Sequence, residues 1–335
     1  MKKAYLFSIL LLIAVLICTS CVRTGSVTNY YKNEEIEKGV VDEIAALDNL
    51  LIESIISGDD KTFNSILRSD LRQEIDKNPS FFNLLREALN DADYRYFERY
   101  HLKISTLNSS SPVVIFSDNN DYSLSLTGKG EMFLSIILIP HGCIDSLLFI
   151  IYDNNNEDWE IQTIYLGDYQ FYGMDANDMY NEAIRLKNES RIVSAYQYAY
   201  SSGLIIRPAP FFQYTNESEI MDDMNALVEE VNNTYDFPIT LKSSGVEVFG
   251  ISSQVTQQDI VPVFMYLTEF DADGSEESAA AIRQEAHQIH EEVMNVFVGL
   301  DQDFDIFLYK AYNEYPSDPD KEYYAYSTII GLPEK

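Results

Sequence analysis

The stretch EMFLSIILIPHGCIDSLLFIIY, residues 131–152, decides the fold of this chain of 335 residues. Two apolar runs of strand length flank the turn-forming letters PHGC, and the second run ends at Tyr152. Apolar runs of this length, bounded by proline and glycine, are typical of strands. The stretch therefore predicts two antiparallel strands, over residues 131–139 and 146–152, that are joined by a turn.

The segments on both sides of this hairpin are also rich in strand-forming residues. They are separated by the turn-forming sequences NSSSP, SDNND, TGKG and DNNNED. Short strands joined by tight turns favour an antiparallel sheet. The strands that we expect span residues 94–107, 113–117, 122–127, 131–139, 146–152 and 159–166.

Helical periodicity precedes these strands. Apolar residues recur at steps of three and four from Ile36 to Ile55, and Gly58 is placed to end that helix. Further helices are expected over residues 60–75 and 79–89, the last beginning with proline, which the first turn tolerates. Helices followed by an antiparallel meander predict an α+β fold, in which the helices pack on one face of the sheet.

The rest of the chain predicts a pair of helices and a second α+β unit. Residues 173–215 predict a helical hairpin that acts as a connector, since small side chains on its second helix let two helices approach closely. The second unit, residues 216–335, is predicted to be a sheet of four or five strands packed against helices over 217–232 and 276–300. Its expected strands span residues 238–241, 246–252, 260–270, 304–312 and 322–330.

The first twenty residues have the composition of an export signal. Two lysines precede an almost unbroken apolar run that ends at Cys18, and small residues then lead to Cys21. A charged start, a short apolar core and a small-residue end are typical of a secretory signal peptide. The run is shorter than the roughly 20 apolar residues that a membrane span needs. Residues 1–20 are therefore predicted to be a signal peptide, and the polar residues 21–35 a tether.

The sequence Cys18-Thr19-Ser20-Cys21 resembles the lipobox of bacterial lipoproteins, although Cys18 stands where leucine is usual. The resemblance implies that Cys21 becomes the first residue of the mature chain and carries a diacylglyceryl thioether and an N-acyl chain such as palmitate. More than one acyl chain makes membrane attachment stable. The chain is then expected outside the cytoplasm, lipid-anchored to the cell membrane or the outer membrane, and Val22 favours the outer one.

Residues 36–172 resemble the NTF2-like (cystatin-like) α+β fold. The letters SGDDKTFNSILRSDLRQEI, residues 57–75, are similar to the second-helix region of exported members, and NEDWEIQTIYLG, residues 156–167, to their last strand. The resemblance implies helices over the concave face of a curved sheet, which can enclose a pocket. Residues 173–215 resemble one tetratricopeptide-like hairpin, and because a stable array needs about three such units, we interpret it as a connector.

Acidic residues dominate the charge of the chain. Asp and Glu number 54 against 23 Lys and Arg, which gives a formal net charge of −31 at pH 7. Such a surface repels phosphate backbones and anionic lipid headgroups. Nucleic-acid binding is therefore not expected, and the membrane contact is expected to be made by the lipid and not by a protein face.

No metal or catalytic motif is complete in the sequence, and no cofactor is indicated. Glu269, Asp271 and Asp273 alternate ahead of a glycine, like the front of a calcium loop, but Ala280 stands where the bidentate glutamate belongs. We interpret the segment as a strand end, a turn and a helix capped by Ser275. Asp271 and Asp273 are the candidates for a metal ion that this segment offers.

The histidines and Cys143 add no stronger site. His287 and His290 have a spacing that two zinc ligands can use, but no third ligand is evident. Cys143 is the one cysteine left after the lipobox, so it is unable to form an internal disulfide. Its neighbour His141 could pair with it as a nucleophile and base, but no orienting acid is evident.

Tyrosine is abundant, with 24 residues against one tryptophan, and aromatic rings can line a binding pocket. Tyrosine is also an ordinary strand residue, so we interpret these clusters first as core and edge packing. The clusters are Tyr94, Tyr96 and Tyr100; Tyr165, Tyr169, Phe171 and Tyr172; and Phe211, Phe212 and Tyr214.

These observations favour a membrane-anchored binding or assembly module without catalysis, whose partner is another envelope protein or a small ligand. Such a module predicts an apolar, tyrosine-lined pocket inside the first unit. One alternative is a small hydrolase or isomerase, which requires His101 or an acid to face that pocket beside a second titratable group. Another is a structural envelope protein, which requires no pocket and a large exposed apolar patch.

Overall fold

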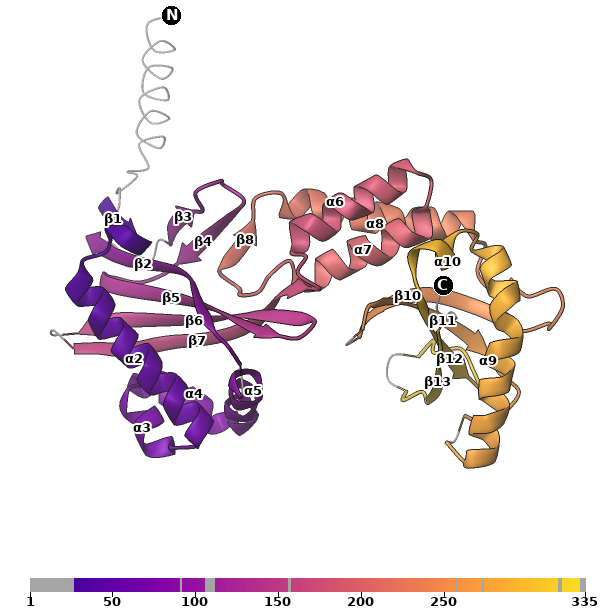
Figure 1. Ribbon diagram of the computed structural model, residues 1–335, viewed down its shortest axis with the longest axis horizontal. Coiled ribbons are helices and arrows are strands. Elements are labelled where there is room, and N and C mark those ends of the chain that lie inside the picture. The colour runs from indigo at the N-terminus through magenta and orange to yellow at the C-terminus, as the bar shows by residue number, and fades with distance from the viewer. Residues whose placement is uncertain are drawn as a thin grey trace, which may run out of the picture.

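The computed structural model describes residues 27–90, 92–105, 112–155, 158–256, 258–272, 274–318 and 321–331. Figure 1 shows two lobes, each with a sheet and helices, that are joined by the helices α6, α7 and α8. The chain is a mixed α+β protein, so the predicted fold class is confirmed.

Antiparallel strands form the large sheet of the first lobe, in the spatial order β1-β2-β5-β6-β7. The predicted hairpin is confirmed as β5 and β6, which pair from Glu131 opposite Asn154 to His141 opposite Ile144. Eight consecutive residues of β5 are buried, so both faces of this strand need a covering layer. The strands are β1 (Val27–Lys32), β2 (Arg95–Ser105), β5 (Gly130–His141), β6 (Ile144–Asn155) and β7 (Asp158–Phe171).

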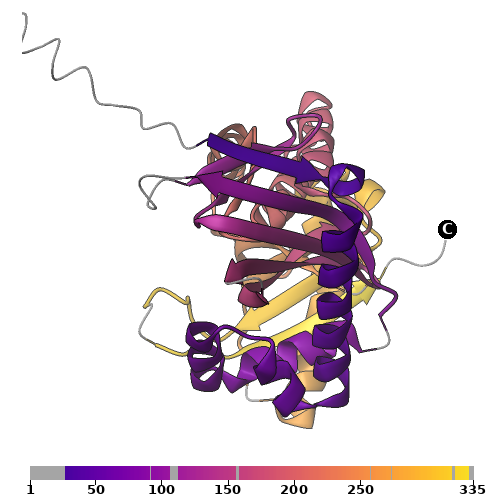
Figure 2. The same ribbon diagram turned by 90° about the vertical axis from the view of Figure 1, so that its left-hand side faces the viewer.

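Helices form the layer on one face, and Figure 2 shows the long indigo helix α2 lying across the strands. Gly58 ends α2 with a φ of 71°, the left-handed conformation that glycine adopts without strain, as predicted. The prediction of one helix over residues 60–75 is wrong, because the Arg68 amide donates to the Ile161 carbonyl at 2.9 Å and interrupts it. The helices are α2 (Lys38–Ser57), α3 (Asp60–Ser65), α4 (Ser69–Lys77) and α5 (Pro79–Leu89).

A small sheet, in the order β3-β4-β8, forms the layer on the opposite face. Along β3, Val113 and Ile115 are buried while Val114 and Phe116 are exposed. The expectation that all six predicted strands share one sheet is therefore wrong for β3 and β4, whose apolar face packs on the large sheet instead of extending it. The strands are β3 (Val113–Phe116), β4 (Tyr122–Leu126) and β8 (Phe212–Tyr214).

The predicted tether begins the large sheet. Residues 27–32 form β1, which pairs with β2 from Val27 opposite Ser105 to Lys32 opposite Tyr100, and a short 3-10 helix, η1 (Asn33–Glu35), follows. The interpretation of residues 21–35 as an irregular tether therefore fails from Val27 on, because the backbone of this segment completes an edge of the sheet. Cys21 lies outside the described residues.

Three helices join the lobes. The predicted hairpin is present as α6 (Ala176–Asn188) and α7 (Ile192–Ile205), and Ala195 and Ala199 of α7 form one buried cluster with Leu227 of the next helix. That helix, α8 (Glu217–Thr234), was expected in the second unit and instead packs on the hairpin. The connector also returns to the first lobe before α8, since it supplies β8 to the small sheet.

The second lobe contains a sheet in the order β13-β12-β11-β10-β9. The central pair β11 and β12 is parallel, with Val263 opposite Leu308, and α9 is the crossover between them. The other neighbours are antiparallel. The elements are β9 (Ile239–Thr240), β10 (Glu247–Val255), β11 (Ile260–Leu267), α9 (Glu276–Val296), α10 (Leu300–Asp303), β12 (Ile306–Tyr312) and β13 (Ala325–Gly331).

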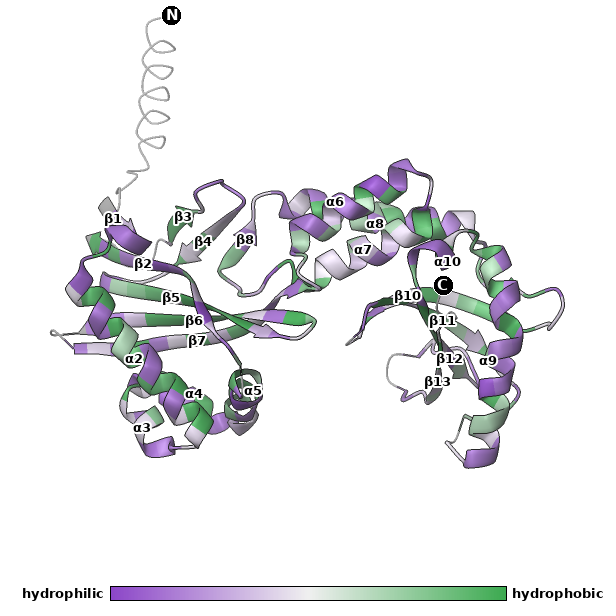
Figure 3. Cartoon of the chain, viewed as in Figure 1, coloured by the Kyte–Doolittle hydropathy of each residue, from purple (hydrophilic) through white to green (hydrophobic). Residues whose placement is uncertain are grey.

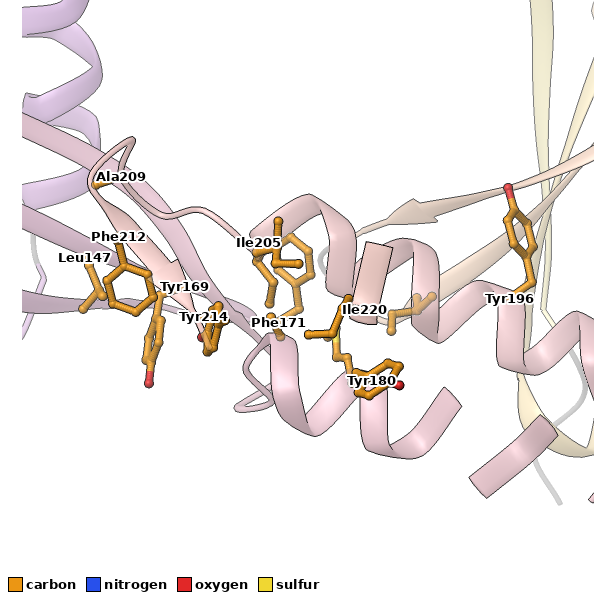
Figure 4. Packing of buried hydrophobic residues seen from close by; sticks show 14 of the residues in the cluster. Leu147, Tyr169, Phe171, Tyr180, Tyr196, Ile205, Ala209, Phe212, Tyr214 and Ile220 are labelled. Carbon is orange, nitrogen blue, oxygen red and sulfur yellow. The ribbon is translucent and has the colours of Figure 1, made fainter. Parts of the chain in front are cut away.

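One buried core runs from the first sheet through the connecting helices into the second lobe. Figure 3 shows its hydrophobic strands in green, and Figure 4 shows Phe212 of β8 beside Leu147 of β6, with Phe171 farther along towards the helices. Gly167 of β7 crosses the chain at Pro208 so closely that an added Cβ would lie 1.9 Å from the Pro208 carbonyl oxygen. This crossing therefore requires glycine.

Candidate ligand-binding site

A buried polar network fills the space between α2 and the first sheet, where the NTF2-like resemblance implies a pocket. Asp48 of α2 accepts hydrogen bonds from Tyr152 at 2.6 Å, Ser135 at 2.8 Å and Tyr96 at 3.0 Å. Asp48 is 1% exposed, and Ser135 and Tyr152 are fully buried. Burial raises the pKa of Asp48, and the bonds from Tyr152 and Ser135 partly offset that rise. The network fastens α2 to the sheet, and its central carboxylate, Asp48, is enclosed.

His101 has a similarly structural environment. Its Nε2 lies 2.7 Å from a Glu131 carboxylate oxygen, and its ring packs against Phe133 and Trp159. The His101 side chain is 2% exposed, so a substrate has no access to its imidazole ring, while the Glu131 side chain is 33% exposed. The geometry therefore does not provide the acid–base pocket that the hydrolase or isomerase alternative requires.

The buried position of His101 predicts a loss of stability in mild acid. Burial lowers the pKa of His101 below its usual 6.5, so the folded state favours the neutral ring. This stabilisation is complete above pH 6.5 and is lost as the pH falls towards the depressed pKa, by up to about 1.4 kcal/mol per pKa unit of depression. Urea unfolding followed by Trp159 fluorescence should show a shallower pH dependence between pH 7 and 5 for His101→Gln than for wild type. Equal slopes would contradict this assignment.

The predicted tyrosine clusters are mostly core. Tyr169, Phe171, Phe212 and Tyr214 are at least nine-tenths buried between the large sheet, the small sheet and the helices. Phe212 stacks on Tyr122 with ring centroids 4.4 Å apart. These rings therefore do not form the tyrosine-lined ligand pocket that was predicted for the first unit.

The metal candidates do not come together. Asp273 lies outside the described residues, Asp271 is exposed, and Ser275 caps α9 by accepting from the Ser278 amide, as predicted. His287 is exposed, while His290 turns inward with its Nδ1 2.8 Å from the Tyr309 hydroxyl. Among the residues that the structure describes, no group of three or more His, Cys, Asp or Glu side chains suits a metal ion.

Cys143 lies at a contact between the lobes. Its Sγ is 3.4 Å from the carbonyl oxygen of Thr256 in the turn after β10, and the Tyr172 hydroxyl donates at 2.5 Å to the same oxygen. His141 is exposed on the neighbouring turn and makes no described contact with the thiol. The predicted interpretation of Cys143 as a turn cysteine fits this position better than that of a nucleophile.

A pocket with a cavity volume of about 470 Å³ opens in the second lobe, at the carboxyl ends of the parallel strands. Leu267, which ends β11, begins one wall, and Asn313, which directly follows β12, contributes to another. Crevices at the carboxyl ends of parallel strands are common ligand sites, because the chain must leave the sheet there. The lining residues are Ser244, Gly245, Val246, Glu247, Leu267, Thr268, Glu269, Phe270, Glu285 and Asn313.

Local hydrogen bonds hold the walls of the pocket. The Asn313 amide donates to the Phe270 carbonyl at 2.7 Å, and its oxygen accepts from the Ala272 amide at 2.9 Å. Glu292 of α9 accepts from the Ser243 amide at 2.6 Å, which fixes the loop ahead of β10. The loops that line the cavity are therefore anchored to β12 and α9, so the pocket is largely preformed.

Carboxylates dominate the chemistry of the pocket. Glu247, Glu269 and Glu285 line it, and no Lys, Arg or His is among its described lining residues. Burial raises the pKa of Glu285, hydrogen bonds from Thr268 and Tyr266 oppose this, and the charge of Glu269 adds to it. Tyr266 is fully buried beside Glu285. Carboxylates without a cationic partner among the described lining residues suit a ligand with a cationic or donor-rich group.

This pocket was not predicted from the sequence, although the order of elements along the chain carries a signal for it. A strand, a long helix and a strand follow one another over residues 260–312, and this order is typical of a parallel pair with a crossover helix. The residues that end such strands are the ones to inspect for a site. Glu285 carried no such signal, because only its position on the packed helix brings it to the strand ends.

Comparison of the chain with protein-family models, with curated proteins and with solved structures found no match. The NTF2-like and tetratricopeptide-like resemblances therefore stay predictions. Within the described residues, no helix has both the length and the apolar character needed to cross a membrane.

Proposed function

We propose that this protein is a lipid-anchored, extracytoplasmic binding protein that holds a positively charged ligand in the pocket of its second lobe. The anchor is Cys21, on the basis of the lipobox resemblance. The observation that carries the binding role is the pocket of about 470 Å³, which three glutamates line without a cationic side chain among the described lining residues. This replaces the tyrosine-lined pocket expected in the first lobe, where the polar groups are enclosed.

Each lining side chain has a distinct role in the proposed binding. Glu285 of α9 lines the pocket beside Tyr266, and its carboxylate pairs with an ammonium or guanidinium group. Glu247, which accepts from the Tyr315 hydroxyl at 2.6 Å, supplies further negative charge to the pocket lining. Phe270 is 43% exposed and offers an apolar surface, or a ring face for a cation, at the mouth. A net charge of −31 also steers cations towards the protein.

Calorimetric titration of the full mature protein with spermidine, agmatine and a lysyl dipeptide tests this role. At least one cation is expected to bind, and Glu285→Gln should weaken that binding about tenfold or more, because it removes the charge of that carboxylate. Glu229→Gln, at an exposed position on α8, is the matched control and should leave the affinity unchanged. If none of the three cations binds, or if both variants lose affinity equally, the pocket is not a cation site.

A further inference from the structure

The outer face of the small sheet is uncharged and carries two exposed apolar side chains among three polar ones, although the chain is strongly acidic. We define this face by Val114, Phe116, Ser123, Ser125 and Gln213. Strand register places Val114 opposite Ser125, and Phe116 opposite Ser123, which in turn lies opposite Gln213. These residues therefore share one face, and it carries no charged side chain in a protein with a net charge of −31.

Val114 and Phe116 project from this face without cover. They are 48% and 53% exposed, while the alternate residues of β3 are buried in the core. Figure 3 shows β3 as a green, hydrophobic strand at the edge of the lobe, near β1. Tyr30 of β1 is 45% exposed and lies opposite Leu102, so it adds aromatic surface on this side of the lobe.

The position of the chain's start indicates what covers this face. β1 begins at Val27, and the six residue steps from Cys21 to Val27 span at most about 20 Å when fully extended. The end of β1 is tied to the turn after β3 by an ion pair of 2.9 Å between Lys32 and Asp118. Figure 1 shows β1 and β3 at the same end of the first lobe. A lipid anchor at Cys21 therefore holds the outer face close to the bilayer.

We infer that the outer face of the small sheet rests on the lipid interface of the membrane that holds the anchor. This inference depends on the proposed anchoring through Cys21. The interface accepts exposed aromatic and apolar side chains, and an uncharged face avoids the repulsion that the acidic remainder of the surface meets there. The tether makes this contact effectively intramolecular, so a few weakly inserted side chains are enough to orient the protein. The membrane contact is then made by protein as well as by lipid, contrary to the expectation from net charge alone.

Tryptophan quenching in vesicles tests the inference. The full lipidated chain is reconstituted into phosphatidylcholine vesicles with brominated acyl chains, which quench a tryptophan that enters the bilayer. Phe116→Trp is expected to lose most of its added emission, and Val114→Trp should behave in the same way. Val298→Trp is the control, since this position is 82% exposed and follows α9 in the second lobe. The emission of the tryptophan at position 298 should not change. The native Trp159 is 8% exposed and contributes the same background fluorescence in every variant.

The outcomes separate this inference from the proposed anchor. Protein that sediments with the vesicles, but whose tryptophans at positions 114 and 116 are quenched no more than the one at 298, would overturn the inference alone. Protein that fails to sediment with the vesicles would overturn the anchor and the inference with it. Co-sedimentation with quenching confined to positions 114 and 116 supports both.

Discussion

Replacing Asp48 by alanine is expected to lower the free energy of unfolding of the first lobe by about 3–5 kcal/mol. The change removes the shared acceptor of three hydroxyl groups and leaves Tyr152 and Ser135 unpaired while fully buried. It also opens a cavity under α2. The only tryptophan, Trp159, lies in the sheet that α2 covers, so urea unfolding followed by its fluorescence reports on this lobe.

Asp42→Ala is the matched control for this prediction. Asp42 lies on the same helix, is exposed, and pairs only with Lys38 among its described contacts, at 2.6 Å. An exposed pair of this kind contributes at most about 0.5 kcal/mol. Equal effects of the two substitutions would show that the buried network does not hold α2 on the sheet.

Replacing Cys21 by serine is expected to move the protein from the membrane fraction to the soluble fraction. The lipobox resemblance assigns the thioether-linked lipid to the Cys21 sulfur, and serine is unable to form that bond. Loss of all acyl chains removes the stable attachment, because the acidic surface has little affinity for anionic headgroups. Labelled palmitate should enter the wild type and be absent from the variant.

Cys143→Ser is the control for this experiment, since it changes the other cysteine that follows the lipobox and lies at a contact with Thr256. It should keep both the label and the membrane location. Equal palmitate labelling of wild type and Cys21→Ser would end the lipoprotein proposal.

The features that the sequence predicted correctly are local ones. The hairpin of β5 and β6 follows from two apolar runs around Pro140 and Gly142, the end of α2 from Gly58, and the start of α9 from Ser275. Each depends on residues a few positions apart, where turn and capping preferences are strong. Periodicity also separated helix from strand along most of the chain, which was sufficient for the α+β class.

The predictions fail where one hydrophobic pattern is compatible with more than one layer of the fold. Periodicity shows that β3 has one apolar face but does not show whether it joins the large sheet or covers it. From the sequence alone, Phe212–Tyr214 is assigned to the connector, because its pairing with β4 exists only in the folded chain. The pocket was missed for the same reason, because Glu247, Glu285 and Asn313 meet only after β11 and β12 have paired in parallel.

The mass of the intact protein, purified from membranes of the cells that produce it, tests the proposed lipid anchor without any substitution. We expect a chain that begins at Cys21, lacks the first twenty residues, and is heavier by a diacylglyceryl group and an N-acyl chain. A chain that still begins at Met1, or one that is cleaved but carries no lipid on Cys21, would contradict it.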